Sequence, residues 1–412
     1  MTDHAPTALS GVTVLDLSRV LAGPWASQLL ADLGADVIKI ERPGSGDDTR
    51  RWGPPFLTDE QGEATDAAYF LAANRNKKSV CIDIASEEGA DIIRRLAAKS
   101  DILIENFKVG GLKKYGLDYP ALSAVNPRLV YCSISGFGQT GPSAARPGYD
   151  YMIQAMGGLM SVTGQPDGAP GAEPMKAGVA VADLFSGMYA ANAILAALRH
   201  AERTGEGQHV DVSLFDCQLA MLANQAANYL VTGAPPQRLG NAHPNIAPYQ
   251  VYKTADAYIV IAVGNDDQFA SLAAAIGAPH LSEDARFRTN PARVSNREAL
   301  NAVLEPIIEA QTSAALFALL DDANVPAGPI NDVAEALEHP QAQARQMTHP
   351  THEHRPDAPA QRYVAHPVKY SRTPTRNDTP PPLLGAHTDK VLETYLGINA
   401  QSRQSLKDKG VL

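Results

Sequence analysis

The chain has 412 residues, 44% of them hydrophobic and 19% charged, a composition typical of a globular protein with two or three domains. Its net charge of −10 at pH 7 argues against a general nucleic-acid or membrane-surface protein, because such proteins carry a basic surplus. The cysteines Cys81, Cys132 and Cys217 follow no CxxC or metal-ligand spacing, so the sequence predicts no metal site and indicates a reduced compartment.

The N-terminal stretch MTDHAPTALSGVTVLDL lacks the basic and long apolar regions of a signal peptide. No segment reaches the ~18 uninterrupted apolar residues that a membrane span needs. We therefore expect a soluble cytoplasmic protein that binds neither nucleic acid nor membrane.

Strand and helix patterns alternate along the first 140 residues. Strands are predicted at residues 12–18, 36–41, 79–84, 101–106 and 129–135, and helices at 24–34, 86–100 and 117–126. Strands separated by single helices predict an α/β fold with a parallel sheet covered by helices on its faces.

The second half of the chain begins with a long apolar helix predicted from residue 178 to 198, followed by a strand that runs into another helix. The segment 232–250 is rich in Pro, Gly and Asn, which is typical of a domain boundary. A hairpin is expected at 251–263, and helices from 265 to about residue 320.

These patterns predict a division into three parts. Residues 1–231 form a large domain and residues 232–340 a small one. Residues 341–412 form a C-terminal linker and a segment that returns to the large domain. Within that last part, residues 353–382 are rich in proline and poorly periodic.

Asp183 is the single charged residue between Lys176 and Arg199. Burying an unpaired carboxylate costs several kcal/mol or forces the group to become neutral. One interpretation is that Asp183 caps the N-terminus of the apolar helix, a contribution of about 1 kcal/mol. The other is that the carboxylate takes part in a reaction.

The loops after the first strands do not carry a dinucleotide signature. The turn SRVLAGP lacks the GxGxxG pattern, and the later RPGSGDD has only Gly44 and Gly46. P-loop, GxSxG, HExxH and EF-hand patterns are also absent. The sequence therefore argues against a nicotinamide cofactor.

Polar residues nevertheless follow the predicted strands: Arg42, Asn106 and Ser135 each come at or just after a strand end. Such positions meet in one crevice in doubly wound folds. The segment NRNKKS adds the basic residues Arg75, Lys77 and Lys78. This basic run is equally consistent with a solvated surface, but convergence of the strand ends would suit a long ligand with phosphates at one end.

Several blocks of the chain resemble one family. They are GVTVLDLSRVLAGPWASQLLADLGADVIKIERPGSGDDTR, NKKSVCIDI, ILIENFKVGGLKKYGL, SISGFGQTGP, GYDYMIQAMGGLMSVTG, VADLFSGMYAA and PLLGAHTDKVL. In this order they are similar to the class III CoA-transferases, also called the CaiB/BaiF family. The resemblance implies a large Rossmann-like domain and a smaller α/β domain in an interlocked homodimer. It also implies coenzyme A thioesters as substrates, with no permanently bound cofactor.

The resemblance further implies roles for individual residues. Asp183 matches the catalytic nucleophile, which attacks the thioester to form an aspartyl anhydride and then an aspartyl-CoA thioester. The expected CoA contacts are Val20, Arg42, Arg75, Ile82, Asn106, Lys114 and Ser135. The expected substrate contacts are Leu21, Arg51, Tyr69, Phe137, Tyr149 and His243, with Arg51 or His243 holding a distal carboxylate.

Three functions remain open. Related α-methylacyl-CoA racemases carry a His where Tyr149 stands, and a tyrosine with a pKa near 10 is a poor two-way proton carrier. Oxalate-specific transferases carry a Gln at Leu21 and a tetraglycine lid that this chain lacks. LGNAHPNIAPYQ instead resembles the branch that moves CoA from succinyl-CoA to C4–C6 dicarboxylates, which we favour over a racemase or a catalytically silent CoA-binding protein.

Overall fold

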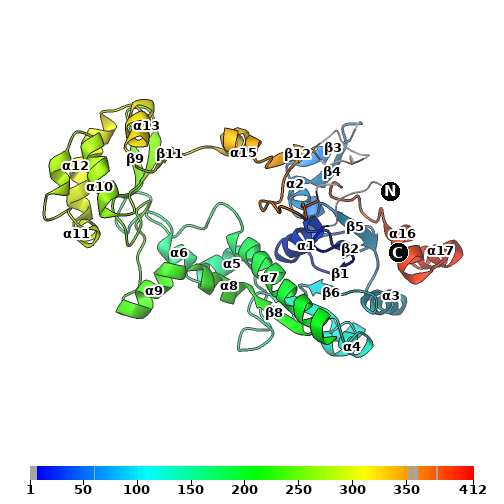
Figure 1. Cartoon of the computed structure of the whole chain (residues 1–412). Helices are drawn as coiled ribbons and strands as arrows, with labels where there is room; N and C mark the ends of the chain where they lie inside the picture. Colours follow the sequence, from blue (N-terminus) through cyan, green and yellow to red (C-terminus); the bar gives the residue numbers. More distant parts are fainter. Residues whose placement is uncertain (1–6, 60, 351–354, 356–360, 377–378) are drawn as a thin grey trace. The chain divides into compact units, whose positions relative to one another are not determined.

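The computed structural model describes residues 7–59, 61–350, 355, 361–376 and 379–412. The chain forms two compact units (Figure 1). The first consists of Met1–Gly157, Gly178–Met221 and Pro340–Leu412, and the second of Gly158–Ala177 and Leu222–His339.

A six-stranded parallel sheet forms the centre of the first unit, which confirms the predicted α/β class. Its strands are β1 Thr13–Asp16, β2 Asp36–Glu41, β5 Lys77–Cys81, β6 Ile102–Glu105, β7 Val130–Ser135 and β8 His209–Ser213. They are ordered β5-β2-β1-β6-β7-β8. Because β1 lies in the middle, the chain builds the sheet outward first to one side and then to the other.

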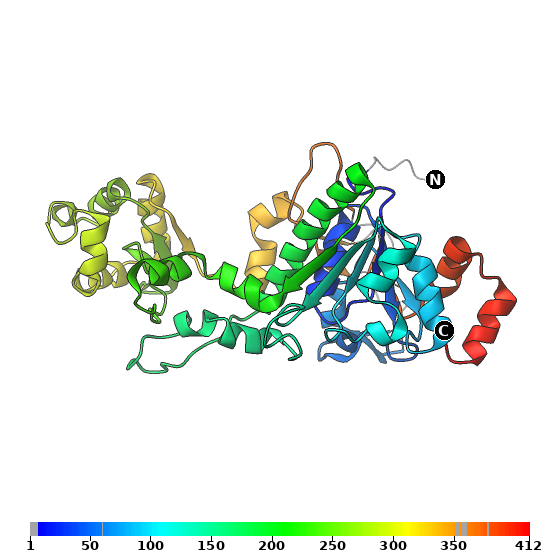
Figure 2. The same ribbon diagram turned by 90° about the horizontal axis from the view of Figure 1, so that it is seen from below.

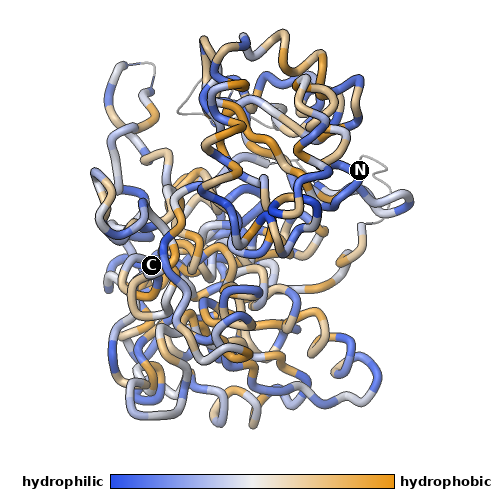
Figure 3. Tube along the Cα trace, turned by 90° about the vertical axis from the view of Figure 1, so that its left-hand side faces the viewer, coloured by the Kyte–Doolittle hydropathy of each residue, from blue (hydrophilic) through white to orange (hydrophobic). Residues whose placement is uncertain are grey.

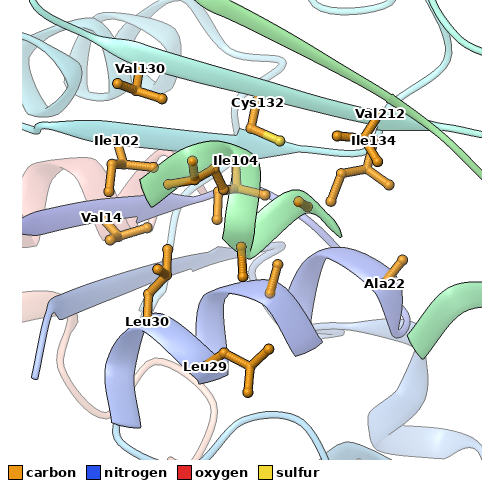
Figure 4. Packing of buried hydrophobic residues seen from close by; sticks show 14 of the residues in the cluster. Val14, Ala22, Leu29, Leu30, Ile102, Ile104, Val130, Cys132, Ile134 and Val212 are labelled. Atoms are coloured by element: carbon orange, nitrogen blue, oxygen red, sulfur yellow. The ribbon is translucent and has the colours of Figure 1, made fainter. Parts of the chain in front are cut away.

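Helices cover both faces of this sheet, so side chains that alternate along each strand enter two different cores. On one face Val14 and Ile104 pack against α1 Ala22–Asp32 and α7 Val181–Thr204 (Figure 4). On the other face Leu15 and Leu103 share a core with α3 Glu87–Ala97 and α4 Tyr119–Val125. The hydrophobic stretches, orange in Figure 3, alternate along the chain with hydrophilic ones.

Helix α7 is the longest element, with 24 residues, and lies beside α1 (Figure 2). By length and composition alone it would be long enough to cross a membrane, although half of its apolar window is buried inside the protein. Gly187 permits its close approach to α1, since a Cβ there would lie 2.7 Å from the carbonyl oxygen of Ala22. Packing in the sheet core therefore accounts for the buried half of its apolar side chains.

The C-terminal segment completes the edge of the sheet beside β5. The backbone N–H of Cys81 donates to Thr388 Oγ1 at 3.0 Å, and that of Asp83 donates to the carbonyl of Val411 at 2.8 Å. The remaining elements of this unit are η1 Asp48–Arg51, β3 Phe56–Thr58, β4 Ala64–Ala67, α2 Ala68–Leu71, η2 Lys113–Tyr115, α5 Asp150–Met156, α8 Leu214–Met221, α15 Pro340–Ala344, β12 Thr348–Pro350, β13 Arg362–Val364, α16 Thr388–Leu396 and α17 Ala400–Asp408.

The second unit contains the predicted hairpin, formed by β9 Tyr249–Lys253 and β10 Tyr258–Ala262. A third strand, β11 Ala327–Pro329, pairs with β10 and was not predicted. The other elements are α6 Leu159–Val162, α9 Ala223–Thr232, α10 Asp266–Ala275, η3 Pro279–Ser282, α11 Asn290–Ser295, α12 Arg297–Glu309, α13 Ser313–Asp322 and α14 Val333–Glu338. Helices α10, α12 and α13 bury Phe269, Leu304 and Leu316 in its core.

This unit differs from the predicted small domain of residues 232–340 because it begins at Leu222 and takes in Gly158–Ala177. The N–H of Gly240 donates to the carbonyl of Gly164 at 3.0 Å, and Arg238 binds both the carbonyl of Gln165 and Asp167. Such long-range hydrogen bonds leave no periodic pattern in the sequence. Part of the predicted proline-rich segment 353–382 lies outside the described residues.

Candidate active site

Two adjoining cavities of about 310 and 440 Å³ open in the first unit, at the carboxyl ends of the parallel strands. The first cavity lies over the ends of β2 and β5, and the second over the ends of β6 and β7 and the start of α7. Arg19, Phe107 and Lys108 line both, so the two cavities form one elongated groove.

The groove lies where the order of the sheet reverses. β1 and β6 are neighbours in the sheet. After β1 the chain continues to β2 on one side, and after β6 it continues to β7 on the other side. Open α/β sheets bind ligands at this kind of switch point. The topology therefore explains why polar strand ends far apart in the sequence meet here.

Cations without acidic partners line the first cavity. Among the described residues, no carboxylate pairs with Arg42, Lys108 or Lys114, whereas Asp48 is paired with Arg19 at 3.0 Å. Ile82 contributes an apolar wall. This end of the groove can therefore hold an anionic group beside a flat apolar one.

Two of the four acids that line the first cavity, Asp47 and Glu41, are neutralised by buried cations. Asp47 accepts from the buried amine of Lys39 at 2.9 Å, and Glu41 accepts from Arg50 at 2.7 Å. Burial opposes the ionised form of Asp47, but Lys39 and the Thr49 donors outweigh it and lower its pKa to about 2. These acids stay paired, and the cations above them remain available to a ligand.

Val20 has a strained backbone at the junction of the groove. Its φ is 72°, a region that a β-branched residue rarely adopts, and its N–H donates to Asp47 Oδ1 at 3.3 Å. Strain of this kind costs about 1–3 kcal/mol and is concentrated at functional sites. Val20 lines the second cavity beside Leu21 and Asn106.

Asp183 lies in the wall of the second cavity and is 9% exposed. Of the two interpretations of Asp183, the one in which it caps the N-terminus of its helix is wrong. Helix α7 begins at Val181 after the N-cap residue Ala180, so Asp183 is the third residue of the first turn. The carboxylate of Asp183 is therefore not used to satisfy the N–H groups at the helix end. It remains available for a reaction in the second cavity.

Asp150, at the start of α5, performs the capping instead. Its Oδ1 accepts the backbone N–H groups of Ala182 at 2.8 Å and Asp183 at 3.3 Å. A pair of glycines makes this approach possible, because a Cβ on Gly136 would lie 2.5 Å from the Cα of Gly148. The loops after β7 and before α5 therefore touch through backbone atoms, and Asp150 lies against the first turn of α7.

The carboxyl group of Asp183 is affected by burial and by this neighbour. Burial and, second, the negative charge of Asp150 raise the pKa of Asp183 to about 7. Burial and the charges of Asp183 and Asp150 also raise the pKa of Tyr69 to about 12, which indicates that its hydroxyl group lies near both acids.

Arg75 does not line the groove, in contrast to its predicted contact with CoA. Its guanidinium is buried and binds Asp32 and the carbonyl of Val364. Lys77 in the same basic run is buried against Asp16 and Asn74, and burial lowers its pKa to about 7. Lys78, the third basic residue of the run, is partly exposed and pairs with Asp36 of β2. Arg75 and Lys77 are therefore held inside the unit by α1, β1 and the C-terminal segment, and only Lys78 reaches the surface.

The other predicted residues fall into two groups. Those that line the groove are Val20, Leu21, Arg42, Ile82, Asn106, Lys114, Ser135, Tyr149 and Asp183. Arg51 is exposed on η1 and lines neither cavity, and Phe137 packs on Phe215 at 5.8 Å. His243 belongs to the second unit, where its ring lies 5.2 Å from Tyr249 and accepts from the N–H of Asn245.

Asp150 and Arg146 lie at the site but were not predicted from the sequence. Both belong to the segment RPGYDYMIQ: Arg146 lies in the loop before α5, and Asp150 is the first residue of α5. Acidic residues are favoured at helix N-termini, and this preference was the available signal for Asp150. Arg146 lines the second cavity together with Asp183 and Tyr149. A basic residue in a proline-glycine loop carries no pattern that distinguishes it from a surface residue.

The groove combines an end lined by cations with a buried carboxyl group, that of Asp183, at its far end. A buried carboxyl group with a raised pKa is also able to move protons. The second partner that a two-way proton transfer needs is not a histidine here, because Tyr149 stands at that position and is 66% exposed. The residues therefore favour attack on a carbonyl over racemisation.

Comparison with known proteins points in the same direction. The model of CoA-transferase family III matches residues 9–388. The chain is 51% identical to a succinate–glutarate CoA-transferase of Agrobacterium fabrum over 93% of this chain and 94% of that one. It is 41% identical to a succinyl-CoA:glutarate CoA-transferase of Homo sapiens over 98% and 90% of the two chains. The crystal structure of a CaiB/BaiF family protein from Brucella suis matches with a TM-score of 0.82 and 50% identity, covering 95% of this chain and 100% of that one.

Proposed function

The chain belongs to CoA-transferase family III, and on this premise we propose that it moves CoA from succinyl-CoA to a small dicarboxylic acid with Asp183 as the nucleophile. The observation that carries the proposal is the position of Asp183. It lies at one end of a groove whose other end presents Arg42 and Lys114, cations to which the described part of the chain supplies no acidic partner, and both ends belong to the same unit. The names of the relatives support succinyl-CoA and glutarate-like acids as the substrates.

The reaction proceeds through two covalent states of Asp183. Its carboxylate attacks the thioester carbonyl of succinyl-CoA, the C–S bond breaks, and a mixed anhydride and CoA thiolate form. The thiolate then attacks the aspartyl carbonyl, which releases succinate and leaves an aspartyl-CoA thioester. The acceptor carboxylate reverses the two steps, so CoA leaves on the acceptor and the Asp183 carboxylate is regenerated.

Burial of Asp183 supports this chemistry, because an anhydride exposed to water hydrolyses. The raised pKa of Asp183 makes its anion a stronger base than an exposed aspartate. Activity should then rise as the pH increases through about 7, where the carboxyl group loses its proton.

Arg42 and Lys114 are proposed to hold the nucleotide end of CoA. A guanidinium binds phosphate bidentately or stacks on a purine, and both residues line the first cavity without acidic partners among the described residues. Lys108 lines both cavities and suits the linking part of the ligand. Val20, Ile82, Asn106 and Ser135 remain proposed CoA contacts, which a CoA-bound structure would test.

Arg146 is proposed to bind the distal carboxylate of the acid, in place of Arg51 and His243. Three cations line the second cavity, but Arg19 is paired with Asp48 and Lys108 also faces the first cavity. Arg146 lines only the second cavity, and its guanidinium lies 5.5 Å from the centre of the Phe137 ring. Among the described residues no carboxylate is paired with it. Its fork of donors matches a carboxylate.

Replacing Arg146 by Met should raise KM for a dicarboxylic acceptor by about 10–100-fold, the effect of losing a hydrogen bond to a charged group worth about 1.5–3 kcal/mol. KM for a monocarboxylic acceptor should not change, because it has no distal carboxylate. Arg51→Met is the matched control, since Arg51 lines neither cavity. Equal losses for both acceptors, or a larger effect in Arg51→Met, would reject the assignment.

The whole proposal is tested by exchange of label between succinyl-CoA and a panel of dicarboxylic acids. Transfer supports the proposed activity. Loss of the α-proton of a branched acyl-CoA to solvent, without transfer, would favour the racemase. Tight CoA binding with neither reaction would favour a silent binding protein.

We also propose that the protein is an interlocked homodimer in the cytoplasm. Support for the dimer comes from the exposed apolar side chains of Phe185, Met188 and Tyr189 on α7, which are 36%, 52% and 46% exposed. Light scattering is expected to give the mass of a dimer that persists on dilution, because threaded chains cannot separate without unfolding. A monomeric mass under native conditions would contradict this proposal.

A further inference from the structure

We propose that Asp150 is a positioning residue of the reaction: its carboxylate holds the first turn of α7, and its charge favours the acylated forms of Asp183 over the free anion. The inference rests on the proposed function, in which Asp183 alternates between a carboxylate and neutral covalent states. Asp150 does not contact the reacting bond, but its charge changes the relative energies of the free and acylated states of Asp183.

The geometry begins with the hydrogen bonds of Asp150. Its Oδ1 accepts the N–H groups of Ala182 and Asp183, and its Oδ2 accepts from Gln154 Nε2 at 2.7 Å. Helix α7 has no side-chain cap of its own. The orientation of Asp183 therefore depends on a residue 33 positions earlier, fixed in place by α5.

The same contact places two acidic side chains at the start of one helix. Both oxygens of the Asp150 carboxyl accept hydrogen bonds from N–H groups. Asp183 has no such donor among the described contacts, so repulsion between the acids acts on Asp183. Other charged or titratable side chains face this region from the cavity wall and α2: Arg19, Lys108, Arg146, Tyr149 and Tyr69.

Acylation removes the repulsion between the two acids. When Asp183 attacks the thioester, its negative charge passes to the departing thiolate, and the anhydride or thioester on Asp183 is neutral. Asp150 therefore raises the energy of the free nucleophile but not that of the covalent states. The cost is partial protonation of the resting nucleophile near neutral pH.

Asp150→Asn separates the charge of Asp150 from its role as a cap, since Asn also accepts N–H groups and ranks with Asp as a capping residue. The acidic limb of the kcat/KM profile should move down by about one pH unit, because a like charge is removed while burial remains. The fraction of enzyme trapped by hydroxylamine in the presence of succinyl-CoA should fall several-fold. Rates at pH 8–9, where Asp183 is ionised in both proteins, should also decrease.

Asp211→Asn is the matched control, because Asp211 also accepts a backbone N–H from another segment, that of Gln139, yet lines neither cavity. Its pH profile and adduct fraction should equal those of the wild type. Asp150→Ala removes both charge and cap and should lose stability as well. An NMR titration of the Asp183 carboxyl carbon measures its protonation even in a variant that does not turn over.

The outcomes separate this inference from the proposed function. Absence of any adduct on Asp183 in the wild type would reject the proposed function. A normal adduct in the wild type, with an unchanged pH limb and adduct fraction in Asp150→Asn, would reject the role of the charge and leave Asp150 as a cap. A shifted limb with a reduced adduct fraction supports the inference.

Discussion

Replacing Asp183 by Asn is expected to lower kcat for CoA transfer by roughly 10⁴-fold or more, the scale seen when a covalent nucleophile is removed. Asn has the same shape but lacks the anionic oxygen that forms the anhydride. The fold and CoA affinity should be retained, because Asp150 and not Asp183 caps α7. Steady-state kinetics and a CoA-binding titration measure the two effects.

Trapping provides the direct evidence for this prediction. Wild-type protein incubated with succinyl-CoA and hydroxylamine or borohydride should carry a modification on the peptide that contains Asp183, and the Asn variant should not. Substantial turnover by the Asn variant, with no adduct in the wild type, would mean that Asp183 has no covalent role.

The Asn variant should also gain stability relative to the wild type as the pH rises. The pKa of Asp183 is raised in the folded state to about 7, from 3.8, so the folded wild type binds a proton more tightly than the unfolded chain. That contribution is fully present below about pH 4 and is lost as the pH increases through 7. Thermal unfolding at pH 4.5 and pH 8 should therefore show a relative gain for Asn at the higher pH.

Arg75→Met is expected to lower the free energy of unfolding by about 3–5 kcal/mol, because it leaves the buried carboxylate of Asp32 without its cation. The side chain of Asp32 is fully buried, and among the described residues Asn76 would still donate to it. CoA affinity should not change where the variant is folded, since Arg75 lines neither cavity.

Arg42→Met is the control for Arg75→Met, because it should weaken CoA binding and leave the stability of the fold unchanged. Arg42 is exposed and lines the first cavity, so its loss should weaken CoA binding by about 10–100-fold and change the free energy of unfolding by less than about 0.5 kcal/mol. Urea unfolding and calorimetric titration of both variants measure the four values. Weak CoA binding by a normally stable Arg75→Met would restore the original prediction that this residue contacts CoA.

The parallel sheet was predictable because its information is local. Buried strands such as 36–41 and amphipathic helices such as 86–100 show their period within a few residues, and their alternation determines a parallel arrangement. Segment boundaries were less accurate: the strand predicted at 79–84 is β5 Lys77–Cys81. The short strand β11 is only three residues long and shows no usable period.

The errors at the site have a common physical cause in sequence separation. Asp183 is a favourable residue both at the N-cap and in the first helical turn, so the sequence alone did not place the helix start at Val181. The actual cap, Asp150, comes from another helix. Arg75 was expected to contact CoA from its basic run and the family resemblance, and its pairing with Asp32, 43 residues earlier, was not foreseeable from the sequence. Pairings of this kind become visible only when the tertiary structure is known.

The C-terminal segment also has a consequence for how the chain folds as it is synthesised. Residues near 388 and 411 donate or accept hydrogen bonds at the edge of β5, more than 300 positions after the strand they complete. When residues 1–340 have emerged from the ribosome, the C-terminal segment that covers the edge beside β5 has not yet been synthesised. Bare strand edges recruit other strands, and contacts of such long range form slowly. A nascent chain stalled before residue 380 should therefore depend on chaperones far more than the finished one.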